Sequence, residues 1–384
     1  MENLLNKADR QWLECVFEKL QVKLGREVDR LGNTIPYISR NGVYSDLDTP
    51  EGIYMWTNGF WAGILWQMYY ATEKAVYLSA ARQAEERLKT ALCGFEGLYH
   101  DVGFMYLLSA VADYRLTGNP RSKIQGLHAA TILAGRYNPT GQYIRAWNQP
   151  SWTEEDVSGW MIIDSMMNMP LLYWAGEISG DPRFRDIAER HTDTILKYGL
   201  RGDGSSNHVV VLDPRTGEYL DNPSGQGYAS GSSWSRGQSW ALYGFSLAYR
   251  YTGKSRYLDA AKRSAHYCIA NMAANDWLPA VDFRAPEHPE KYDSTAGMVI
   301  ASALLELKEH VGVYEQEIYF KSAVKILKAC EETFCNWNSE IDGIVDGGTV
   351  LYHGSKDANV PIIYGDYFFI ESVLRLLDKH VLLW

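Results

Sequence analysis

One short pattern recurs along the chain and restricts the folds open to it. The pattern is a helix end, a glycine, a brief turn and a new helix, and it occurs at residues 114–121, 174–184 and 249–257. Glycine readily takes the left-handed conformation that ends a helix, and Pro, Ser or Asp commonly opens the next one. Weaker copies occur at 69–77 and 309–314. With copies roughly 60–70 residues apart, the unit holds two helices and the chain holds about six units.

Two kinds of helix alternate with these turns. The segments after the turns are amphipathic and are expected to be outer helices: 77–93, 183–200, 257–272 and 317–334. The segments before the turns are apolar on nearly all sides: 59–70, 102–116, 161–178, 237–251 and 296–309. An all-apolar helix needs cover on both sides, so we predict an all-α fold, a closed α/α toroid with an inner and an outer ring. An open helical solenoid is the alternative. Strand-like runs are few, the best being 209–212, and they fall in connections.

The composition bounds the domain count and the partners. No Ser/Gly/Pro tract, charge block or low-complexity run interrupts the chain, so we expect one domain over residues 1–384. With 37 Lys and Arg against 47 Asp and Glu, and no basic stripe, nucleic acid and anionic membranes are poor partners. The 13 Trp and 26 Tyr exceed the needs of a core, and surplus aromatic rings commonly line sites for sugar-like ligands. A densely packed core is the other explanation.

The N-terminal residues, the cysteines and the known binding motifs indicate the cellular compartment and the need for a cofactor. The first twenty residues carry several charges and no unbroken apolar core, and no long apolar span follows, so a soluble cytoplasmic protein is expected. The five cysteines are odd in number and scattered, as is typical of reduced thiols. The sequence has no HExxH motif, no CxxC pair, no phosphate-binding glycine loop and no G-x-S-x-G elbow. We therefore expect no metal and no cofactor.

Two aspartates stand inside apolar runs. Asp164 lies in W-M-I-I-D-S-M-M-N-M-P, and Asp101 lies in L-Y-H-D-V-G-F. A carboxylate that is removed from water must be paired, hydrogen-bonded or protonated, so each is a candidate acid. A helix cap or a buried hydrogen-bond anchor is the structural alternative for each. Two semi-buried carboxylates together indicate proton chemistry.

Polar residues interrupt the beginnings of the apolar segments, and a closed ring would gather them at one end. They include Trp56, Asn58, His100 and the segment W-S-R-G-Q-S-W at 234–240. In that segment Arg236 stands between Trp234 and Trp240, where a guanidinium could bind a carboxylate while the indoles hold a sugar face. Arg236 could instead bond carbonyls at a helix start. Such convergence forms a pocket and strengthens the catalytic interpretation of Asp101 and Asp164.

The connections add further candidates. His208 and Gln226 stand in the long irregular segment 201–233, and His208 could bind an acidic group or lie exposed. Trp147 precedes the Asp164 segment in a polar loop and could stack on a ligand or pack in the core. Two carboxylates, aromatic residues and an anion binder, without a metal motif, favour acid/base hydrolysis of a carbohydrate.

Five motifs resemble those of the unsaturated glucuronyl hydrolases, which form glycoside hydrolase family 88. The motifs are W-T-N-G-F-W-A-G-I-L-W at 56–66, H-D-V-G-F at 100–104, I-I-D-S-M-M-N-M-P-L-L-Y-W-A-G at 162–176, W-S-R-G-Q-S-W-A-L-Y-G-F at 234–245 and Y-D-S-T-A at 292–296. The resemblance extends from about residue 35 to near the C-terminus. It implies an (α/α)6 barrel and a glycosidase that removes a non-reducing-end 4,5-unsaturated glucuronic acid from oligosaccharides made by polysaccharide lyases.

The resemblance also implies roles for individual residues. Asp164 would protonate C4 of the double bond and then help water to add at C5, while Asp101 would bind ring hydroxyls and maintain the protonation of Asp164. Substrate-binding roles fall on residues matched one by one to the family: Trp147, His208, Gln226, Arg236, Trp240 and, more weakly, Tyr352. Gly225 stands where some members have His, and Asn58 where an Asp can occur, so substrate preference is affected. The competing functions are an unsaturated rhamnogalacturonyl hydrolase acting on pectin fragments and a sugar-binding toroid without catalysis.

Overall fold

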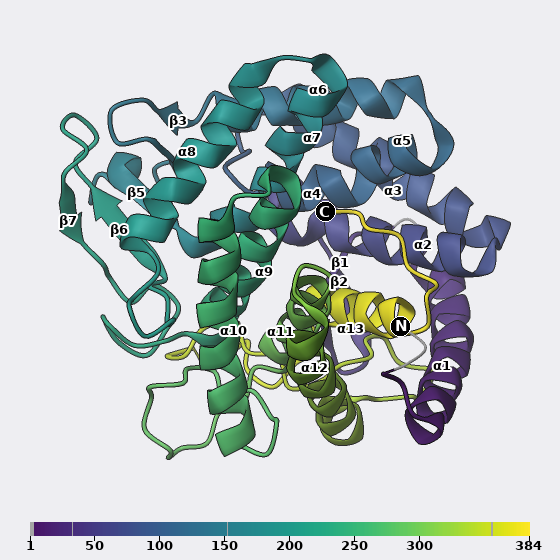
Figure 1. Ribbon diagram of the computed structural model, residues 1–384. Helices are drawn as coiled ribbons and strands as arrows, with labels where there is room; N and C mark the ends of the chain where they lie inside the picture. The colour runs from purple at the N-terminus through teal and green to yellow at the C-terminus, as the bar shows by residue number, and fades with distance from the viewer. Residues whose placement is uncertain (1–3, 33, 152, 355) are drawn as a thin grey trace.

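The inner ring of the protein is built from helices that are buried on nearly every side. The computed structural model describes residues 4–32, 34–151, 153–354 and 356–384. Figure 1 shows the helices arranged around a common centre. Those of the inner ring are α2 (Gly59–Thr72), α4 (Val102–Tyr106) continued through one π-helical turn into α5 (Ala112–Thr117), α7 (Met169–Ser179), α9 (Ser235–Thr252), α11 (Ser294–Lys308) and α13 (Ile363–Leu376). All residues of α11 and α13 are buried, as expected of helices covered on both sides.

The outer helices cover this ring with one apolar face each. They are α1 (Lys7–Leu31), α3 (Ala75–Gly94), α6 (Pro120–Ala134), α8 (Pro182–Tyr198), α10 (Ser255–Ala274) and α12 (Val313–Phe334). The turns between the rings follow the pattern found in the sequence. Gly180 ends α7 in the left-handed conformation with φ of 70°, and Asp181 then caps α8 by accepting a hydrogen bond from the backbone N–H of Arg183.

The ring is closed, which confirms the toroid and excludes the open solenoid. Helix α13 contacts both α11 and α2, so the last inner helix lies beside the first. The sequence prediction had missed α13 as an inner helix and had missed α1 and α6 as outer helices. The charged residues inside α13 concealed its burial in the sequence. They can be buried because each of them has a partner: Asp366 accepts from Tyr44 Oη, Glu371 accepts from Tyr243 Oη, and Arg375 pairs with Glu306.

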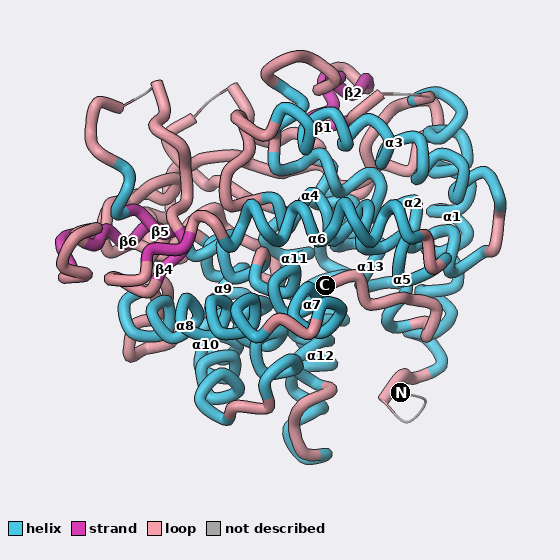
Figure 2. Tube along the Cα trace, turned by 90° about the horizontal axis from the view of Figure 1, so that it is seen from above, coloured by secondary structure: helices cyan, strands magenta, loops and turns pink. Residues whose placement is uncertain are grey.

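Short strands occupy the connections at the margin of the helical body, as Figure 2 shows. They pair as β1 (Pro36–Arg40) with β2 (Val43–Asp46), β3 (Tyr137–Asn138) with β4 (Tyr143–Ile144), and β5 (Trp160–Ile162) with β6 (Val209–Leu212) and β7 (Tyr219–Asp221), all antiparallel. The run at 209–212 is thus a strand, as predicted. The prediction of one inner helix over 161–178 was wrong at its start. Residues 160–162 pair with β6, residues 163–167 form a 3-10 helix, and only then does α7 begin.

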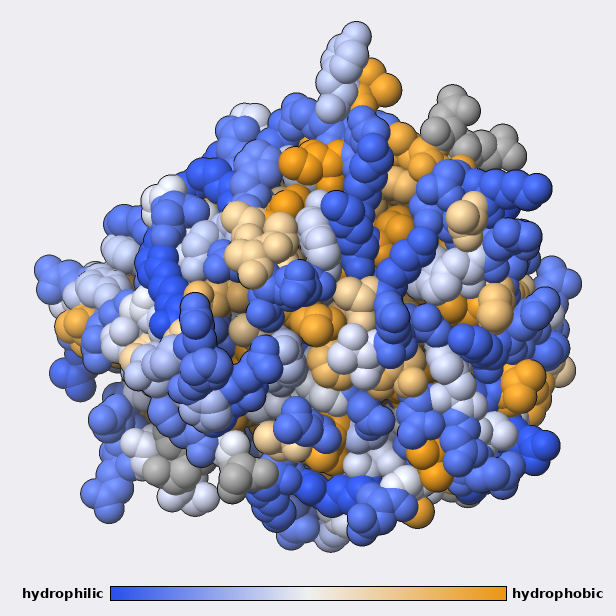
Figure 3. All heavy atoms as spheres, turned by 90° about the horizontal axis from the view of Figure 1, so that it is seen from below, coloured by the Kyte–Doolittle hydropathy of each residue, from blue (hydrophilic) through white to orange (hydrophobic). Residues whose placement is uncertain are grey.

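One main hydrophobic core runs through both rings of the described residues, and a single domain over residues 1–384 stays a prediction. At its centre the indole of Trp384 stacks on Phe368, with ring centroids 5.7 Å apart and planes 5° from parallel. The face drawn in Figure 3 is mainly hydrophilic, with separate hydrophobic spots. None of the helices in the described residues has the length and apolar character to cross a membrane.

Candidate active site

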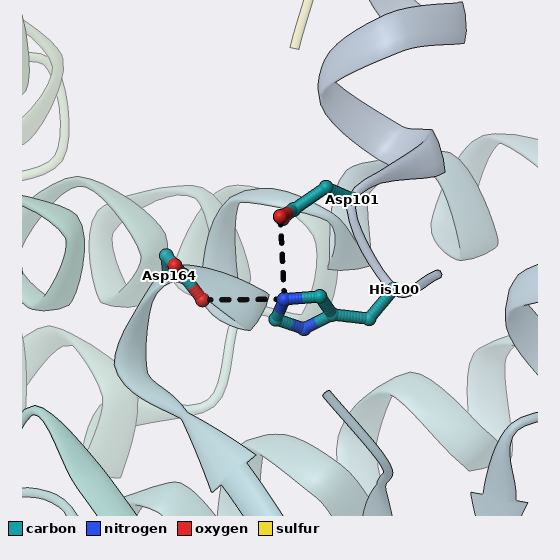
Figure 4. Close-up of side chains that lie close together, drawn as sticks. All are labelled: His100, Asp101 and Asp164. Atoms are coloured by element: carbon teal, nitrogen blue, oxygen red, sulfur yellow. Dashed lines mark ion pairs between the residues drawn. The ribbon is translucent and has the colours of Figure 1, made fainter. Parts of the chain in front are cut away.

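Asp101 and Asp164 meet at one imidazole, as Figure 4 shows. The Nε2 atom of His100 lies 3.3 Å from Oδ2 of Asp101 and 3.6 Å from Oδ1 of Asp164. His100 is fully buried, Asp101 is 5% exposed, and the side chain of Asp164 keeps 18% of its surface accessible. The two aspartates are therefore brought together as the sequence predicted, and Asp164 is the one of the two that is more open to a ligand.

Asp101 is fixed in place by Asn168, which belongs to the segment that carries Asp164. It stands directly before α4, but its side chain makes no capping hydrogen bond there, so the cap explanation is wrong for this residue. Instead, Oδ1 of Asp101 accepts a 2.8 Å hydrogen bond from the side-chain Nδ2 of Asn168. The backbone N–H of Phe104 donates to the other end of that amide, at 3.0 Å. Asn168 thus ties the Asp101 helix to the segment that carries Asp164.

A neutral histidine holds the 3-10 turn that carries Asp164. The backbone N–H of Ile144 donates to Nδ1 of His191, at 3.0 Å, so Nδ1 is unprotonated. The proton on Nε2 then points to the hydroxyl of Ser165, 2.6 Å away, and that hydroxyl donates to the carbonyl of Ile162. Burial lowers the pKa of His191 to about 3, which keeps this arrangement neutral across the physiological range.

The surroundings of Asp164 favour its protonated form. Burial, followed by the negative charge of Asp101, raises the pKa of Asp164 to about 7, although His100, the Ser165 backbone and Arg236 act in the opposite direction. Burial opposes charge on His100 as well, but the two carboxylates outweigh it and raise the pKa of His100. Near neutrality the cluster can therefore store and release protons, which is what a general acid needs.

Aromatic residues form a wall beside the two aspartates. Trp56 is partly exposed and packs near Tyr364, with ring centroids 4.9 Å apart, and near Phe104, at 5.1 Å. Trp240 lies behind them, 6.4 Å from Trp56 and 5.3 Å from Phe104. Because Trp240 is only 1% exposed, it supports the wall from within and does not offer an open stacking face. Trp56 is the better placed of the two for contact with a ligand.

Arg236 has the structural role that the sequence left as an alternative. Its guanidinium is 1% exposed and forms a 2.6 Å ion pair with Asp293. It also donates to the carbonyls of Thr349 and Val350, at 2.8 and 2.6 Å, and stacks on Trp234, 4.5 Å from the ring centroid. These contacts fix the segment 349–350 against α9. The role of Arg236 as a substrate-carboxylate binder stays a prediction.

His208 and Gln226 lie together and share a hydrogen bond. The backbone N–H of Gln226 donates to Nδ1 of His208, and the side-chain Nε2 of Gln226 donates to the carbonyl of Val350. His208 is 7% exposed, so it is not the exposed residue that the sequence allowed. Gly225 makes the approach possible, since a Cβ there would lie 2.2 Å from Nδ1 of His208. A histidine at position 225 would therefore collide with His208 in its present position.

Three other predicted ligand residues are held mainly by the protein. Asn58 donates through Nδ2 to the carbonyls of Gly52 and Ile53 and is buried. Trp147 packs on a small cluster that includes Trp160, with ring centroids 5.9 Å apart. Tyr352 is 6% exposed, and its backbone N–H donates to the carbonyl of Gln226.

The sequence analysis assigned no role in the site to Asn168, Ser165, His191 and Asp293. Ser165 and Asn168 had a local signal, since they stand one and four residues after Asp164 in a segment already singled out. Asp293 also had a signal, since it stands in the Y-D-S-T-A motif at 292–296, at the start of an apolar segment. His191 had none, because its partner Ser165 is 26 residues away in the chain. Among the described residues, only His100, Asp101 and Asp164 come close enough to surround a cation, with ligand atoms within 4.8 Å of one another. Their contacts with one another account for this closeness, and the prediction of no metal stays a prediction.

Comparison with known proteins relates this arrangement to one family. Residues 29–275 match the model of Glycosyl Hydrolase Family 88. An unsaturated glucuronyl hydrolase of Bacillus sp. (strain GL1) is 33% identical over 371 residues, 95% of this chain and 96% of the relative. An unsaturated chondroitin disaccharide hydrolase of Streptococcus pneumoniae (strain ATCC BAA-255 / R6) is 31% identical, over 90% of this chain and 86% of the relative. A solved unsaturated glucuronyl hydrolase structure with dGlcA-Glc-Rha-Glc superimposes with a TM-score of 0.88, at 32% identity, over 95% of this chain and 96% of that one.

Proposed function

This chain belongs to Glycosyl Hydrolase Family 88, and from that premise we propose how its two buried aspartates divide the reaction between them. The chain is a glycosidase, an unsaturated glucuronyl hydrolase, that removes the non-reducing-end 4,5-unsaturated glucuronic acid from oligosaccharides left by polysaccharide lyases. The observation that supports the division best is the difference between the carboxyls. Asp164 is accessible and has its pKa raised to about 7, whereas Asp101 is enclosed and accepts a hydrogen bond.

Asp164 acts as the proton donor in this proposal. Its carboxyl proton adds to C4 of the vinyl ether, and the positive charge that forms at C5 is shared with the ring oxygen. A water molecule then bonds to C5 and gives a proton back to the Asp164 carboxylate, which restores the acid. The C5 hemiketal opens, and the hemiacetal left at C1 expels the remaining sugar as an alcohol. No bond to the protein forms at any stage.

Asp101 and His100 keep the proton available. The negative charge of Asp101 raises the pKa of Asp164 and so opposes early loss of the proton. Once Asp164 has become a carboxylate, the nearby His100 Nε2, 3.6 Å away, offsets part of the new charge. In this proposal Asp101 and His100 both control the protonation of Asp164, and Asp101 also binds ring hydroxyls of the sugar.

The substrate would lie against the partly exposed Trp56 and the neutral ring of His208. Burial lowers the pKa of His208 to about 3, so this histidine offers an N–H donor and not a cation. Among the described residues its Nε2 has no hydrogen-bond partner. A buried N–H without a partner is costly, and a sugar oxygen would satisfy it. Three further candidates for contact with the substrate are Gln226, Tyr352 and Trp147.

An absorbance assay tests the function directly. The conjugated uronate absorbs in the ultraviolet, and hydration of its double bond removes the band. The purified protein is incubated with lyase-generated disaccharides from sulfated and unsulfated chondroitin, hyaluronan and gellan, and with unsaturated pectin fragments. Loss of the band with glucuronyl substrates is expected. Turnover of pectin fragments alone would indicate the rhamnogalacturonyl activity, and binding with a persistent band would indicate a sugar-binding protein.

We also propose a cytoplasmic location. Within the described residues all five cysteines are free thiols, two of them buried, which fits a reducing compartment. Cell fractionation followed by immunodetection tests this. Recovery of the protein outside the cytoplasmic fraction would reject the proposed location while leaving the enzymatic function untouched.

A further inference from the structure

The amide of Asn168 occupies a special place between the two aspartates. It stands on the segment that follows Asp164, four residues on, and it reaches across to Asp101. Asn168 is fully buried, and both ends of its amide are bonded: Oδ1 accepts from the backbone N–H of Phe104, and Nδ2 donates to Asp101. Gly103 allows this approach, because a Cβ at that position would lie 2.4 Å from Oδ1 of Asn168.

The backbone fixes which way this amide faces. An amide can rotate by half a turn with little change in shape, but the N–H of Phe104 can only donate, so it requires the oxygen of Asn168. The NH2 group must then face Asp101, and it too can only donate. Asp101 is thereby placed opposite a permanent donor, and a hydrogen bond of this kind favours the ionised form of a carboxyl group. A proton on Oδ1 would leave two donors facing each other, and a proton on Oδ2 would face the Nε2 atom of His100, 3.3 Å away.

No side-chain amide in the described part of the chain reaches Asp164, whose recorded donor is the backbone N–H of Ser165. Among the described residues, Oδ1 of Asp164 has no hydrogen-bond partner, and the nearest polar atom recorded is the His100 Nε2 at 3.6 Å. The two carboxyls therefore differ in how their oxygens are occupied: both oxygens of Asp101 face a nitrogen, at Asn168 and at His100, whereas Oδ1 of Asp164 has no hydrogen-bond partner within the described residues. One is held as an acceptor by a side chain with no other possible orientation, and the other is not.

We propose that Asn168 is a positioning residue that assigns the shared proton to Asp164, by holding Asp101 as a carboxylate. The assignment rests on the proposed function, since it explains which of two neighbouring aspartates serves as the acid. It also predicts which limb of the pH profile depends on the amide. The acidic limb reflects uptake of a second proton by the pair of aspartates, and the alkaline limb reflects loss of the Asp164 proton.

Other charges face the pair and have to stay constant in a test. His100 and Asp164 face Asp101 directly, Tyr99 and Arg136 lie within electrostatic range of it, and Arg236 acts on Asp164. A substitution of Asn168 by an uncharged residue changes none of these groups. Leucine is close to asparagine in shape and has no polar group, so N168L removes the donor with little change in volume.

The test compares N168L with a matched control. Gln67 is a buried amide that is also bonded at both ends, by the carbonyl and the N–H of Val381, and it has no recorded contact with the aspartates. In N168L the acidic limb of the kcat/KM profile is expected to move up by about one pH unit, the value of one donor bond to a charged group. The alkaline limb stays in place or rises slightly, and KM changes little. Q67L loses comparable stability but keeps both limbs.

Three results would overturn the assignment. The first is a folded N168L, verified by circular dichroism, whose acidic limb coincides with that of the wild type. The second is an equal movement of the limb in Q67L. The third comes from wild-type protein carrying 13C in its aspartate carboxyls, with resonances identified through D101N and D164N: a proton found on Asp101 near neutrality refutes the proposal, even if N168L and the smaller N168S fail to fold. Failure of the proposed function looks different, because D164N would then retain turnover.

Discussion

The backbone N–H of Gln226 donates a 2.9 Å hydrogen bond to Nδ1 of His208. The carbonyl of Ser224 is also 3.2 Å from that nitrogen, but the Gln226 N–H is nearer and has no role except as a donor. Nδ1 must then be unprotonated, and the ring proton resides on Nε2. The loop that carries Gln226 thus sets the tautomer of a histidine eighteen residues earlier in the chain.

This tautomer predicts how H208A behaves. Loss of one N–H donor to the substrate is expected to raise KM about tenfold, the usual effect of a single hydrogen bond. Since the pKa of His208 lies at about 3, the ratio of wild-type to variant KM stays constant between pH 5 and 9. Steady-state kinetics across that range measures the ratio. A ratio that collapses above pH 6.5 would mean that His208 binds as an imidazolium.

D164N is expected to lose turnover and to keep binding. The substitution removes the proton donor with little change in volume, and general acids commonly contribute 10²–10⁴-fold to a rate. We expect kcat to fall at least about 100-fold in the ultraviolet assay, while calorimetry still detects the disaccharide. Turnover near the wild-type level would remove Asp164 from its assigned role.

The activity of the wild-type enzyme is expected to decline above about pH 7. The pKa of Asp164 is raised to about 7 by burial and by Asp101, and the reaction needs the protonated form. The profile of kcat/KM against pH measures this limb. In a D101N variant the neighbouring charge is absent, so the limb moves to lower pH. An alkaline limb that does not respond to D101N would contradict the coupling of the two aspartates.

The same shift predicts a pH dependence of stability. The pKa of Asp164 is higher in the folded protein than its ordinary value of 3.8, so the folded state binds the proton more tightly. The stabilisation from that proton is complete below about pH 4 and is lost as the pH rises through about 7. Urea unfolding at several pH values measures it. Relative to D164N, the wild type should lose stability between pH 4 and 8, and parallel curves would contradict the assignment.

Arg236 is expected to matter chiefly for stability. Its guanidinium pairs with Asp293 inside the protein, and removal of one partner leaves the other charge buried without compensation. Such losses commonly cost about 3–5 kcal/mol. Urea denaturation of R236M should show a loss of this size, and adding D293N should recover part of it. Unchanged stability with a raised KM would restore the substrate-binding role inferred from the sequence.

The sequence predicted those parts of the fold that depend on local patterns. The alternation of all-apolar and amphipathic segments was enough to predict two rings, although not the helices α1, α6 and α13, and single aspartates inside apolar runs were enough to single out Asp101 and Asp164. The partners of polar side chains could not be predicted in this way. Arg236 looks available between two indoles, and only the fold brings Asp293, 57 residues on, against it. The charges of α13 suggested exposure because the residues that neutralise them come from four other parts of the chain.

The contact between α13 and α2 bears on how the enzyme comes into being during synthesis. The ring of Tyr364, which lies against Trp56, is made more than three hundred residues after it. When both aspartates have been synthesised, Tyr364 of the aromatic wall beside them has therefore not yet been added to the chain. Until α13 packs between α11 and α2, the inner ring of helices is open and the site around Asp164 is incomplete. A nascent chain should therefore gain glycosidase activity late and abruptly.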